Sequence, residues 1–420
     1  MGSMNSSRTK YDVVVIGGGA SGMMAAAVAA RRGLRILVAE PQNNLGKKLR
    51  ITGKGRCNVT NNCDVREFLD NVPRNSRFLY SAINGFTPEN VISHFEALGV
   101  PLKTERGKRV FPVSDSAHDI ADALVRDLAK AGAEIRHAAV RGILTTEDGA
   151  IRAVTTTEGE ISCGAVILAT GGASYPGTGS RGDGYKIAAA LGHKIEEPHP
   201  SLVPLESDAD YCAEMQGFSL KNVTLTVNED GRAIYSELGE MLFTHFGVSG
   251  PLVLSASAHM RKWGKSEYGF SIDLKPALDE KTLDARILRD FADMQNREFK
   301  NSLGGLSGRA MVPVLVRLSG IPPETKVNSI TKEQRRTLVR LFKSFPVPVT
   351  SPRPMEEAIV TSGGISVREI DPKTMESKLI RGLYFAGEVI DVDAYTGGFN
   401  LQIAWSTGYA AGSNVRRGST

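Results

Sequence analysis

The chain has 420 residues, of which 41% are hydrophobic and 23% are charged, and its formal net charge is +5. This composition is typical of a globular protein with two or three domains, and its interspersed charges form no long basic block or basic-aromatic array, so we expect no nucleic-acid partner. No apolar run reaches the roughly 18 residues of a membrane span and no signal-peptide core is present, so we expect a cytoplasmic protein without a membrane partner.

The first segment, residues 11–40, has the pattern strand, glycine turn, helix, strand, acid. Its glycines fit G-x-G-x-x-G, in which the first permits a tight turn, the second lets the backbone approach a pyrophosphate, and the third lets the helix pack on the strand. Glu40 ends the second strand, where an acid accepts a hydrogen bond from a ribose hydroxyl. The segment predicts a dinucleotide site made by Gly17, Gly19, Ala20, Ser21, Gly22 and Glu40.

The next part of the chain is predicted to complete this first domain. Thr87 and Asn90 have the spacing of a capping box, with Pro88 at the first helical position, and residues 119–131 form an amphipathic helix. A buried strand over 161–170 ends in Ala-Thr-Gly-Gly, a sequence expected close to the pyrophosphate or the adenine. The cofactor-binding residues predicted here are Val140, Thr170, Gly171 and Gly172.

After residue 200 the pattern changes to alternating apolar and polar residues, which predicts an antiparallel sheet with one wet face. Residues 279–344 are predicted to be helical, with a capping box at Thr331 and Gln334. Four prolines in 346–354 indicate a linker or an edge segment. The predicted domains are a first domain over 1–200 and 351–420, a β domain over 201–278 with 345–350, and a helical domain over 279–344.

The final segment decides which dinucleotide is bound. Residues 381–388 read as a strand followed by glycine and acid, and a glycine turn then opens a helix near residue 398. FAD is longer than NAD, so the protein must also hold its far end. The carboxylate of this acid could bind a ribityl hydroxyl, and a helix N-terminus could face the flavin. A capped helix docked on the sheet is the alternative. The residues predicted for this end are Gly387, Glu388, Gly397, Gly398, Phe399, Asn400 and Leu401.

Four further motifs are more specific: LGKKLRITGKGRCNVTN at 45–61, LFTHFGVSGP at 242–251, TSGGISV at 361–367 and YTGGF at 395–399. With the glycine motifs, they make the chain similar to the BaiN/YhiN-type flavoproteins, which include aminoacetone oxidase-like members and have a GR2-like FAD fold. The resemblance implies an α/β fold, with a Rossmann-like FAD-binding domain in two sequence segments and inserted antiparallel β and helical domains. Bile-acid enone reduction and amine oxidation have both been attributed to members.

The loop after the first β-α-β unit is expected to run along the flavin. Its predicted cofactor-binding residues are Lys48, Gly53, Gly55, Arg56, Cys57 and Asn58. Arg56 is a catalytic candidate that offsets charge on the reduced flavin, or else it holds a phosphate or a carboxylate. Cys57 and Cys63 suggest a dithiol flavoprotein as an alternative, but that chemistry needs a second nucleotide motif, which the sequence lacks.

Two further catalytic candidates are His245, a proton donor or a structural loop histidine, and Tyr395, which lines the pocket or stacks passively. No cysteine or histidine spacing fits a metal site. We predict an FAD-dependent oxidoreductase that transfers hydride between flavin N5 and a small organic substrate, with NAD(P)H as transient donor and an enone-like acceptor. The alternatives are an amine oxidase that uses O2 and a flavin-binding redox-sensing module. The sequence predicts no oligomeric state.

Overall fold

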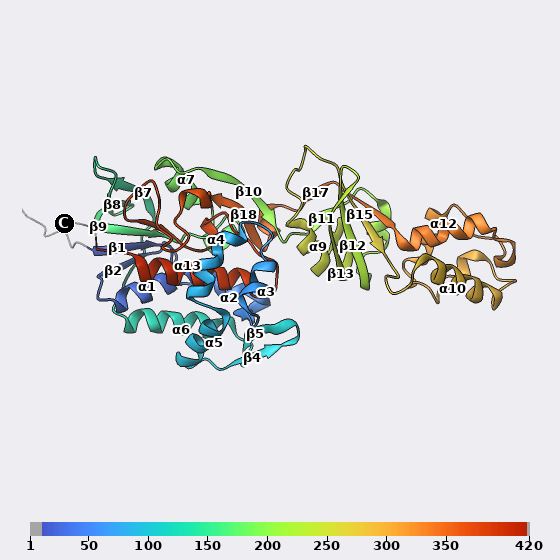
Figure 1. The fold of residues 1–420 in the computed structure, drawn as a ribbon, viewed down its shortest axis with the longest axis horizontal. Helices are drawn as coiled ribbons and strands as arrows, with labels where there is room; N and C mark the ends of the chain where they lie inside the picture. Colours follow the sequence, from blue (N-terminus) through green and yellow to red (C-terminus); the bar gives the residue numbers. More distant parts are fainter. Residues whose placement is uncertain (1–10, 418–420) are drawn as a thin grey trace, which may run out of the picture. The chain divides into compact units, whose positions relative to one another are not determined.

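The computed structural model of the chain describes residues 11–417. The chain divides into two compact units: a first unit that runs to Ser201 and resumes at Met355, and an inserted unit, Leu202–Pro354 (Figure 1). The expected lack of a signal-peptide core concerns residues that lie outside the described ones. The predicted α/β fold, with a Rossmann-like domain in two segments and an inserted antiparallel sheet, is confirmed.

The main sheet of the first unit is parallel at its centre. Its strand order is β6-β2-β1-β9, and β9 pairs through its second half with β19 and through its first half with the antiparallel strand β8, which in turn pairs with β7. Apolar, β-branched runs form β1, β2 and β9 because these strands are covered on both faces. The strands are β1 (Tyr11–Ile16), β2 (Ile36–Ala39), β6 (Glu134–Arg136), β7 (Val140–Thr145), β8 (Ile151–Thr156), β9 (Gly159–Leu168) and β19 (Leu383–Phe385).

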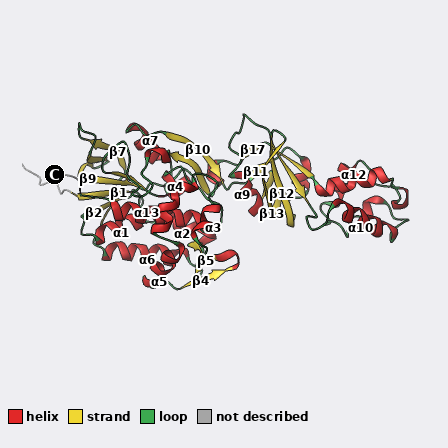
Figure 2. Cartoon of the chain, viewed as in Figure 1, coloured by secondary structure: helices red, strands yellow, loops and turns green. Residues whose placement is uncertain are grey.

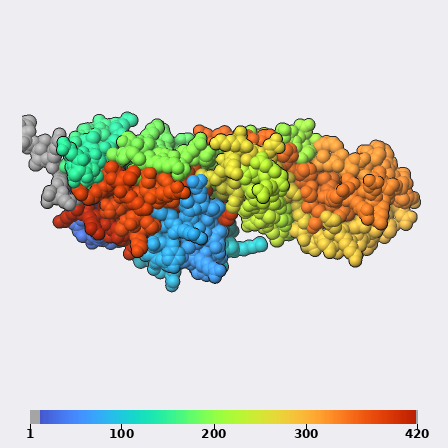
Figure 3. All heavy atoms as spheres, turned by 45° about the horizontal axis from the view of Figure 1, so that its top comes forward, coloured from blue at the N-terminus to red at the C-terminus, as the bar shows by residue number. Residues whose placement is uncertain are grey.

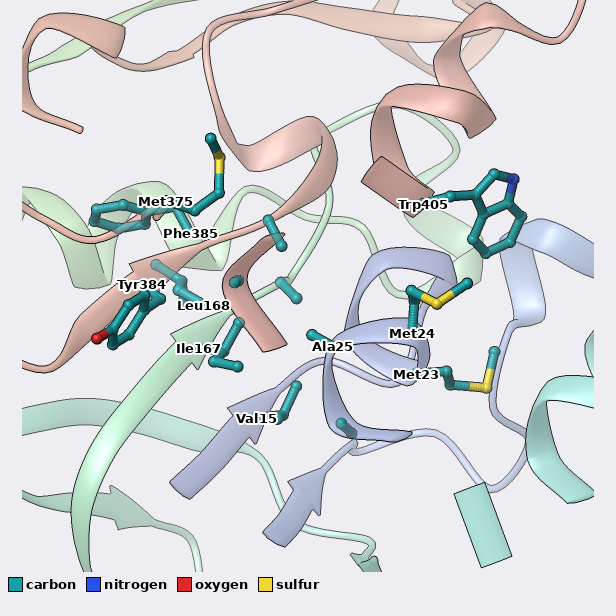
Figure 4. Close-up of a cluster of buried hydrophobic side chains, with 14 of the residues drawn as sticks. Val15, Met23, Met24, Ala25, Ile167, Leu168, Met375, Tyr384, Phe385 and Trp405 are labelled. Atoms are coloured by element: carbon teal, nitrogen blue, oxygen red, sulfur yellow. The ribbon is translucent and has the colours of Figure 1, made fainter. Parts of the chain in front are cut away.

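Two helices from opposite ends of the chain pack directly on each other: α1 (Ala20–Arg31) and α13 (Phe399–Asn414). Their backbones approach closely, because a Cβ atom at Gly408 would lie 2.5 Å from the carbonyl oxygen of Ser21. Side chains of β1, α1, β9, β19 and α13 form one buried cluster, in which Trp405 is completely enclosed (Figure 4). The core therefore joins the two sequence segments of the first unit.

The other elements of the first unit surround this core. The capping box predicted at Thr87 and Asn90 is present at the start of α5. Short antiparallel sheets are formed by β3-β5-β4 and by β10-β18. These elements are α2 (Lys47–Ile51), α3 (Val65–Asp70), α4 (Ser76–Gly85), α5 (Pro88–Ala97), α6 (Ala117–Lys130), α7 (Asp183–Ala190), β3 (Thr60–Asn61), β4 (Leu102–Glu105), β5 (Arg109–Pro112), β10 (Ile195–Ser201) and β18 (Val360–Ile365).

The inserted unit contains an antiparallel sheet of order β16-β15-β12-β13-β14-β11-β17. Val223, Leu225 and Val227 are buried on one face of β12, as the alternation predicts. The proline-rich segment supplies the edge strand β16, where missing backbone donors are tolerated. The strands are β11 (Leu205–Glu206), β12 (Ser219–Glu229), β13 (Arg232–Thr244), β14 (Gly247–Ser249), β15 (Tyr268–Asp273), β16 (Phe345–Val349) and β17 (Ser351–Pro352), and two helices accompany them, α8 (Asp210–Glu214) and α9 (Pro251–Ser257).

The remaining part of the inserted unit is helical, as Figure 2 shows around α10 and α12. Its helices are α10 (Glu280–Ala292), α11 (Val312–Ser319) and α12 (Lys332–Lys343). The predicted capping box of Thr331 and Gln334 opens α12. The finer division into β and helical domains remains a prediction. Between residues 11 and 417, no helix has the length and the apolar character needed to span a membrane.

Candidate functional site

The carboxyl ends of four neighbouring parallel strands meet at one edge of the sheet in the first unit. The chain leaves these strands at Gly17, Glu40, Ala169 and Ala386. The N–H groups of Gly17, Ala169 and Ala386 donate to the last residue of a neighbouring strand, at 2.9, 2.9 and 3.1 Å. The structure thus brings the three predicted glycine segments together, at the edge where open α/β sheets bind their ligands.

The turn after β1 is shaped by its glycines in different ways. Gly17 has φ +106°, and a Cβ atom there would lie 2.5 Å from the carbonyl oxygen of Ala169. A Cβ atom at Gly22 would lie 2.0 Å from the carbonyl oxygen of Gly17. At Gly19, by contrast, a Cβ atom would meet nothing within 4 Å. The first and third glycines therefore close the turn, whereas the second faces open space.

The helix that follows this turn begins without a side-chain cap. Gly19 is its N-cap residue, and Ala20 and Ser21 form the first turn of α1. The Glu40 carboxylate lies beside the turn, where it accepts from the N–H groups of Gly18 (2.8 Å) and Gln42 (2.9 Å). An uncapped helix N-terminus presents unpaired N–H groups, which suit the pyrophosphate of a dinucleotide.

The segment after β9 passes behind the first glycine turn. Gly171 has φ +72°, and a Cβ atom at Gly172 would lie 2.5 Å from the hydroxyl oxygen of Thr361. The Thr170 hydroxyl is directed at α7, because a Cβ atom at Gly184 would lie 2.0 Å from it. The Thr170 hydroxyl is buried without a hydrogen-bond partner among the described residues, and the carbonyl oxygen of Gly172 accepts from the N–H of Gly182 at 3.2 Å.

The end of β19 is tied to both long helices. The N–H of Gly387 donates to the Thr407 hydroxyl of α13 at 2.9 Å, and the Ser21 hydroxyl of α1 donates to the carbonyl oxygen of Ala386 at 3.3 Å. A Cβ atom at Gly387, where φ is +77°, would lie 2.4 Å from that Ser21 hydroxyl. Ser21, predicted as a cofactor contact, thus also joins the first segment to the last.

The predicted residues Lys48 and Glu388 belong to one polar cluster. The Lys48 ammonium lies 2.8 Å from a Glu388 carboxylate oxygen and donates to the Ser174 hydroxyl at 2.7 Å. The N–H of Thr361 donates to Glu388 at 2.8 Å. Ser174 and Thr361 were not among the predicted site residues, although Thr361 opens the TSGG motif, whose Gly-Gly pair after two hydroxyl residues was the available signal.

A second glycine turn opens α13 and contacts the segment after residue 57. Gly398 has φ +100°, and a Cβ atom there would lie 2.4 Å from the carbonyl oxygen of Thr60. The Asn61 side-chain amide donates to the carbonyl oxygen of Gly397 at 3.1 Å. Buried hydrogen bonds from Thr60 to Gln402 and from the Trp405 indole to a backbone carbonyl strengthen this contact.

The other residues predicted at this end have different surroundings. Phe399 is buried with its ring edge-on to Phe68, their centroids 5.5 Å apart, and Leu401 is half-buried. The Asn400 amide exchanges hydrogen bonds with the backbone of Ala394 at 2.7 and 2.9 Å, so it holds the loop before the turn. On the face drawn in Figure 3, this C-terminal segment lies beside the N-terminal part of the chain.

The Arg56 side chain is already engaged with protein groups. Its guanidinium lies 2.6 Å from carboxylate oxygens of Glu105 and of Asp115 and above the Phe111 ring. The hydrogen bond that Arg56 donates to Glu105 raises the pKa of Arg56 and lowers the pKa of Glu105. Arg56 therefore anchors the loop through two carboxylates, and its catalytic role remains a prediction. Gly53 and Gly55 both have positive φ in this loop.

Cys57 and Cys63 are free thiols. Cys57 is completely buried, and burial raises its pKa well above the usual range; burial also raises the pKa of Cys63 to about 11. Because the thiolate is the reactive form of cysteine, these surroundings do not suit dithiol chemistry.

The remaining candidates are dispersed. Tyr395 is half-buried in the first unit, and its N–H donates to the carbonyl oxygen of Asn71 at 3.0 Å. His245 lies in the inserted unit, exposed between β13 and β14 with its ring 5.1 Å from that of Phe246. Val140 begins β7 opposite Thr156. The catalytic roles of Tyr395 and His245 remain predictions.

The geometry fits a long ligand held at both ends. Both α1 and α13 begin at glycine turns without side-chain caps, and the side-chain oxygen Oδ1 of Asn58, next to Gly398, is buried without a hydrogen-bond partner among the described residues. FAD would suit such a site, because it carries a pyrophosphate for the first turn and a flavin ring with polar edges for the second. No cluster of three potential metal ligands occurs in residues 11–417.

A family and two named enzymes match nearly the whole chain. Residues 11–414 match the family described as HI0933-like protein Rossmann domain. A ribosomal RNA dihydrouridine synthase of Escherichia coli (strain K12) is 30% identical over 409 residues, covering 97% of this chain and 98% of the relative. A 3-dehydro-bile acid delta(4,6)-reductase of Clostridium scindens is 30% identical over 383 residues, covering 90% and 92%.

Solved structures also align with most of the chain. The 3-ketosteroid-delta4-(5alpha)-dehydrogenase from Rhodococcus jostii RHA1 aligns with a TM-score of 0.49 at 15% identity, over 98% of each chain.

Proposed function

The chain belongs to the HI0933-like family of FAD-dependent oxidoreductases, and we propose that it reduces a carbon–carbon double bond conjugated to a carbonyl group, with NAD(P)H as the electron donor. The predicted family and enzyme class are confirmed. The acceptor, the donor and the roles of individual residues are our proposal.

One observation carries the choice of reaction: two relatives that span nearly the whole chain at 30% identity bear names with the same bond chemistry. A 3-dehydro bile acid with delta(4,6) unsaturation has double bonds conjugated to its 3-oxo group. Dihydrouridine is uridine with its ring double bond reduced, and that bond is also conjugated to a carbonyl. Both reactions are enone-like reductions.

In this proposal, the N-terminal turn binds the pyrophosphate of FAD through Gly19 and the N–H groups of α1. Glu40 is adjacent to this turn and accepts from the adenosine ribose. At the other end, the Gly397–Gly398 turn and the N-terminus of α13 contact the flavin, which places the positive end of a helix dipole there. Bound here, FAD would accept a hydride from NAD(P)H and, in its reduced form, would pass it to the double bond, while a proton completes the reduction.

Tyr395 is our candidate proton donor for the carbon next to the carbonyl group. It lies two residues before the Gly397–Gly398 turn, and its hydroxyl is a suitable acid for this step. The polar cluster of Lys48, Ser174 and Glu388 is proposed to orient the ribityl chain, because it joins three segments beside the central turns.

Anaerobic stopped-flow absorbance of the flavin band tests the reaction. We expect NADH or NADPH to bleach the band, and a steroid enone or a uridine-containing RNA to restore it without oxygen. Bleaching by amines alone, with peroxide formed on reoxidation, would instead identify an amine oxidase. A holoprotein that exchanges electrons with none of these compounds would favour the redox-sensing module.

A further inference from the structure

The positive charge of the chain is concentrated in the helical part of the inserted unit. Residues 279–344 contain 13 lysines and arginines against 8 aspartates and glutamates, a net charge of +5. The whole chain also has a net charge of +5, so its other residues are balanced. The net positive charge of the chain therefore lies in this region, whereas positive and negative charges balance over the rest of the sequence.

Within this region, the side of α12 that faces the protein interior is accounted for by packing and by an ion pair. Leu338, Val339 and Phe342 are buried. The Arg335 guanidinium, on the same helix, donates to both carboxylate oxygens of Asp284 of α10 at 2.5 and 3.2 Å. Packing and ion pairing on this side account for the fold of the helix.

The outward side carries what we call the basic ridge: Lys332, Arg336 and Arg340, four residues apart along α12. All three side chains are exposed, and none forms an ion pair with a carboxylate of the described chain; Arg340 donates to the Thr337 hydroxyl at 3.1 Å. Residues at this spacing lie on one helix face, about 6 Å apart along the axis. The ridge therefore presents a row of exposed cations whose charge no carboxylate of the described chain neutralises.

We propose that the basic ridge binds the phosphate backbone of RNA. A row of unpaired cations on an exposed helix matches a chain of phosphates, and release of counterions from the nucleic acid drives such binding. An anionic membrane is the less suitable partner, because an interfacial helix needs an exposed apolar face. The apolar side of α12 is buried.

The inference rests on the proposed function and restricts its substrate class to RNA, in which a uracil base is the acceptor of the hydride. In this arrangement the ridge contacts phosphates and gives affinity without reading the sequence. The ridge thus favours a polynucleotide over a free steroid as the substrate class.

Fluorescence anisotropy of the holoenzyme with a fluorescein-labelled, uridine-rich single-stranded RNA tests the proposal. We expect binding that weakens steeply with salt. R336A/R340A should bind about tenfold more weakly. The slope of log affinity against log salt concentration should become shallower by about 1.4, which is about 0.7 for each lost phosphate contact. R336K/R340K, which keeps both charges, should restore most of the affinity.

The matched control is R126A/K130A on α6 of the first unit. These cations are also exposed and four residues apart on a helix, so the control removes the same charge. Equal loss of affinity in both double variants, or no loss in R336A/R340A, would overturn the proposal. So would binding of the wild type to phosphatidylglycerol vesicles but not to RNA. Since the assay contains no nicotinamide, its result is independent of whether the proposed reduction takes place.

Discussion

The two glycine turns of the first unit differ in what makes them necessary. In the N-terminal turn, Gly22 lies against the carbonyl of Gly17, five residues earlier, although Gly17 itself lies against the distant Ala169. In the C-terminal turn, Gly398 lies against the Thr60 carbonyl of a distant segment. The contact between Gly22 and Gly17 can be predicted from the sequence because the two residues are close in the chain, whereas the contacts of Gly17 and Gly398 depend on how remote segments meet.

The largest expected effect separates two glycines of the same motif. Gly22→Ala places a Cβ atom on the Gly17 carbonyl, and we expect a loss of about 3 to 4 kcal/mol of unfolding free energy. Gly19→Val meets no protein atom within 4 Å, so the apoprotein should stay within about 1 kcal/mol of the wild type but lose FAD. Urea unfolding of the apoproteins and flavin absorbance of the purified variants measure the two effects.

Wild-type flavin content in Gly19→Val would contradict the assignment of this turn to the pyrophosphate. Equal destabilisation by both substitutions would show that the two glycines do not have separate roles.

The C-terminal turn is expected to respond with an intermediate effect. Gly398→Ala puts a side chain at φ +100° and against the Thr60 carbonyl, which should cost about 2 to 3 kcal/mol and weaken FAD retention. Gly107→Ala is the control, because φ there is +75° but nothing lies within 4 Å of the added atom. Gly107→Ala should therefore lose only the unfolding free energy that the strained backbone costs. Urea unfolding compares the unfolding free energies of the two variants. An equal loss in both variants would indicate that the contact with Thr60 contributes nothing.

The smallest effect concerns the loop that precedes Thr60. The hydrogen bond from Arg56 lowers the pKa of Glu105, and those from Lys103 and Arg56 lower that of Asp115. A carboxyl group with a lowered pKa stabilises the folded state above its unfolded pKa, and this contribution is lost as the pH falls through the folded value. The loop should therefore loosen below the ordinary carboxyl values of 4.5 and 3.8.

Protection factors from hydrogen exchange of residues 52–58, taken relative to the intrinsic rate at each pH, measure this loosening. Glu105→Gln should lower the protection at neutral pH and reduce its acid dependence. Equal protection at neutral and acidic pH in the wild type would show that Arg56 does not anchor the loop.

Much of the fold was predictable because it depends on local patterns. The capping boxes at Thr87 and Thr331 follow from side chains three residues apart. Buried parallel strands follow from β-branched runs, and the edge strand β16 follows from its prolines. The assignments of individual cofactor and catalytic residues remain predictions, because no ligand contact tests them.

The sequence by itself determined the dinucleotide motif, the return of the chain to the first unit and the family, since these depend on residue types at short spacings. Only the tertiary structure decided that Arg56 is paired with Glu105 and Asp115, that Lys48 meets Glu388, and that Cys57 is buried. It also separated the inward and outward cations of α12. These facts depend on contacts between residues far apart in the chain, and local spacing carries no information about them.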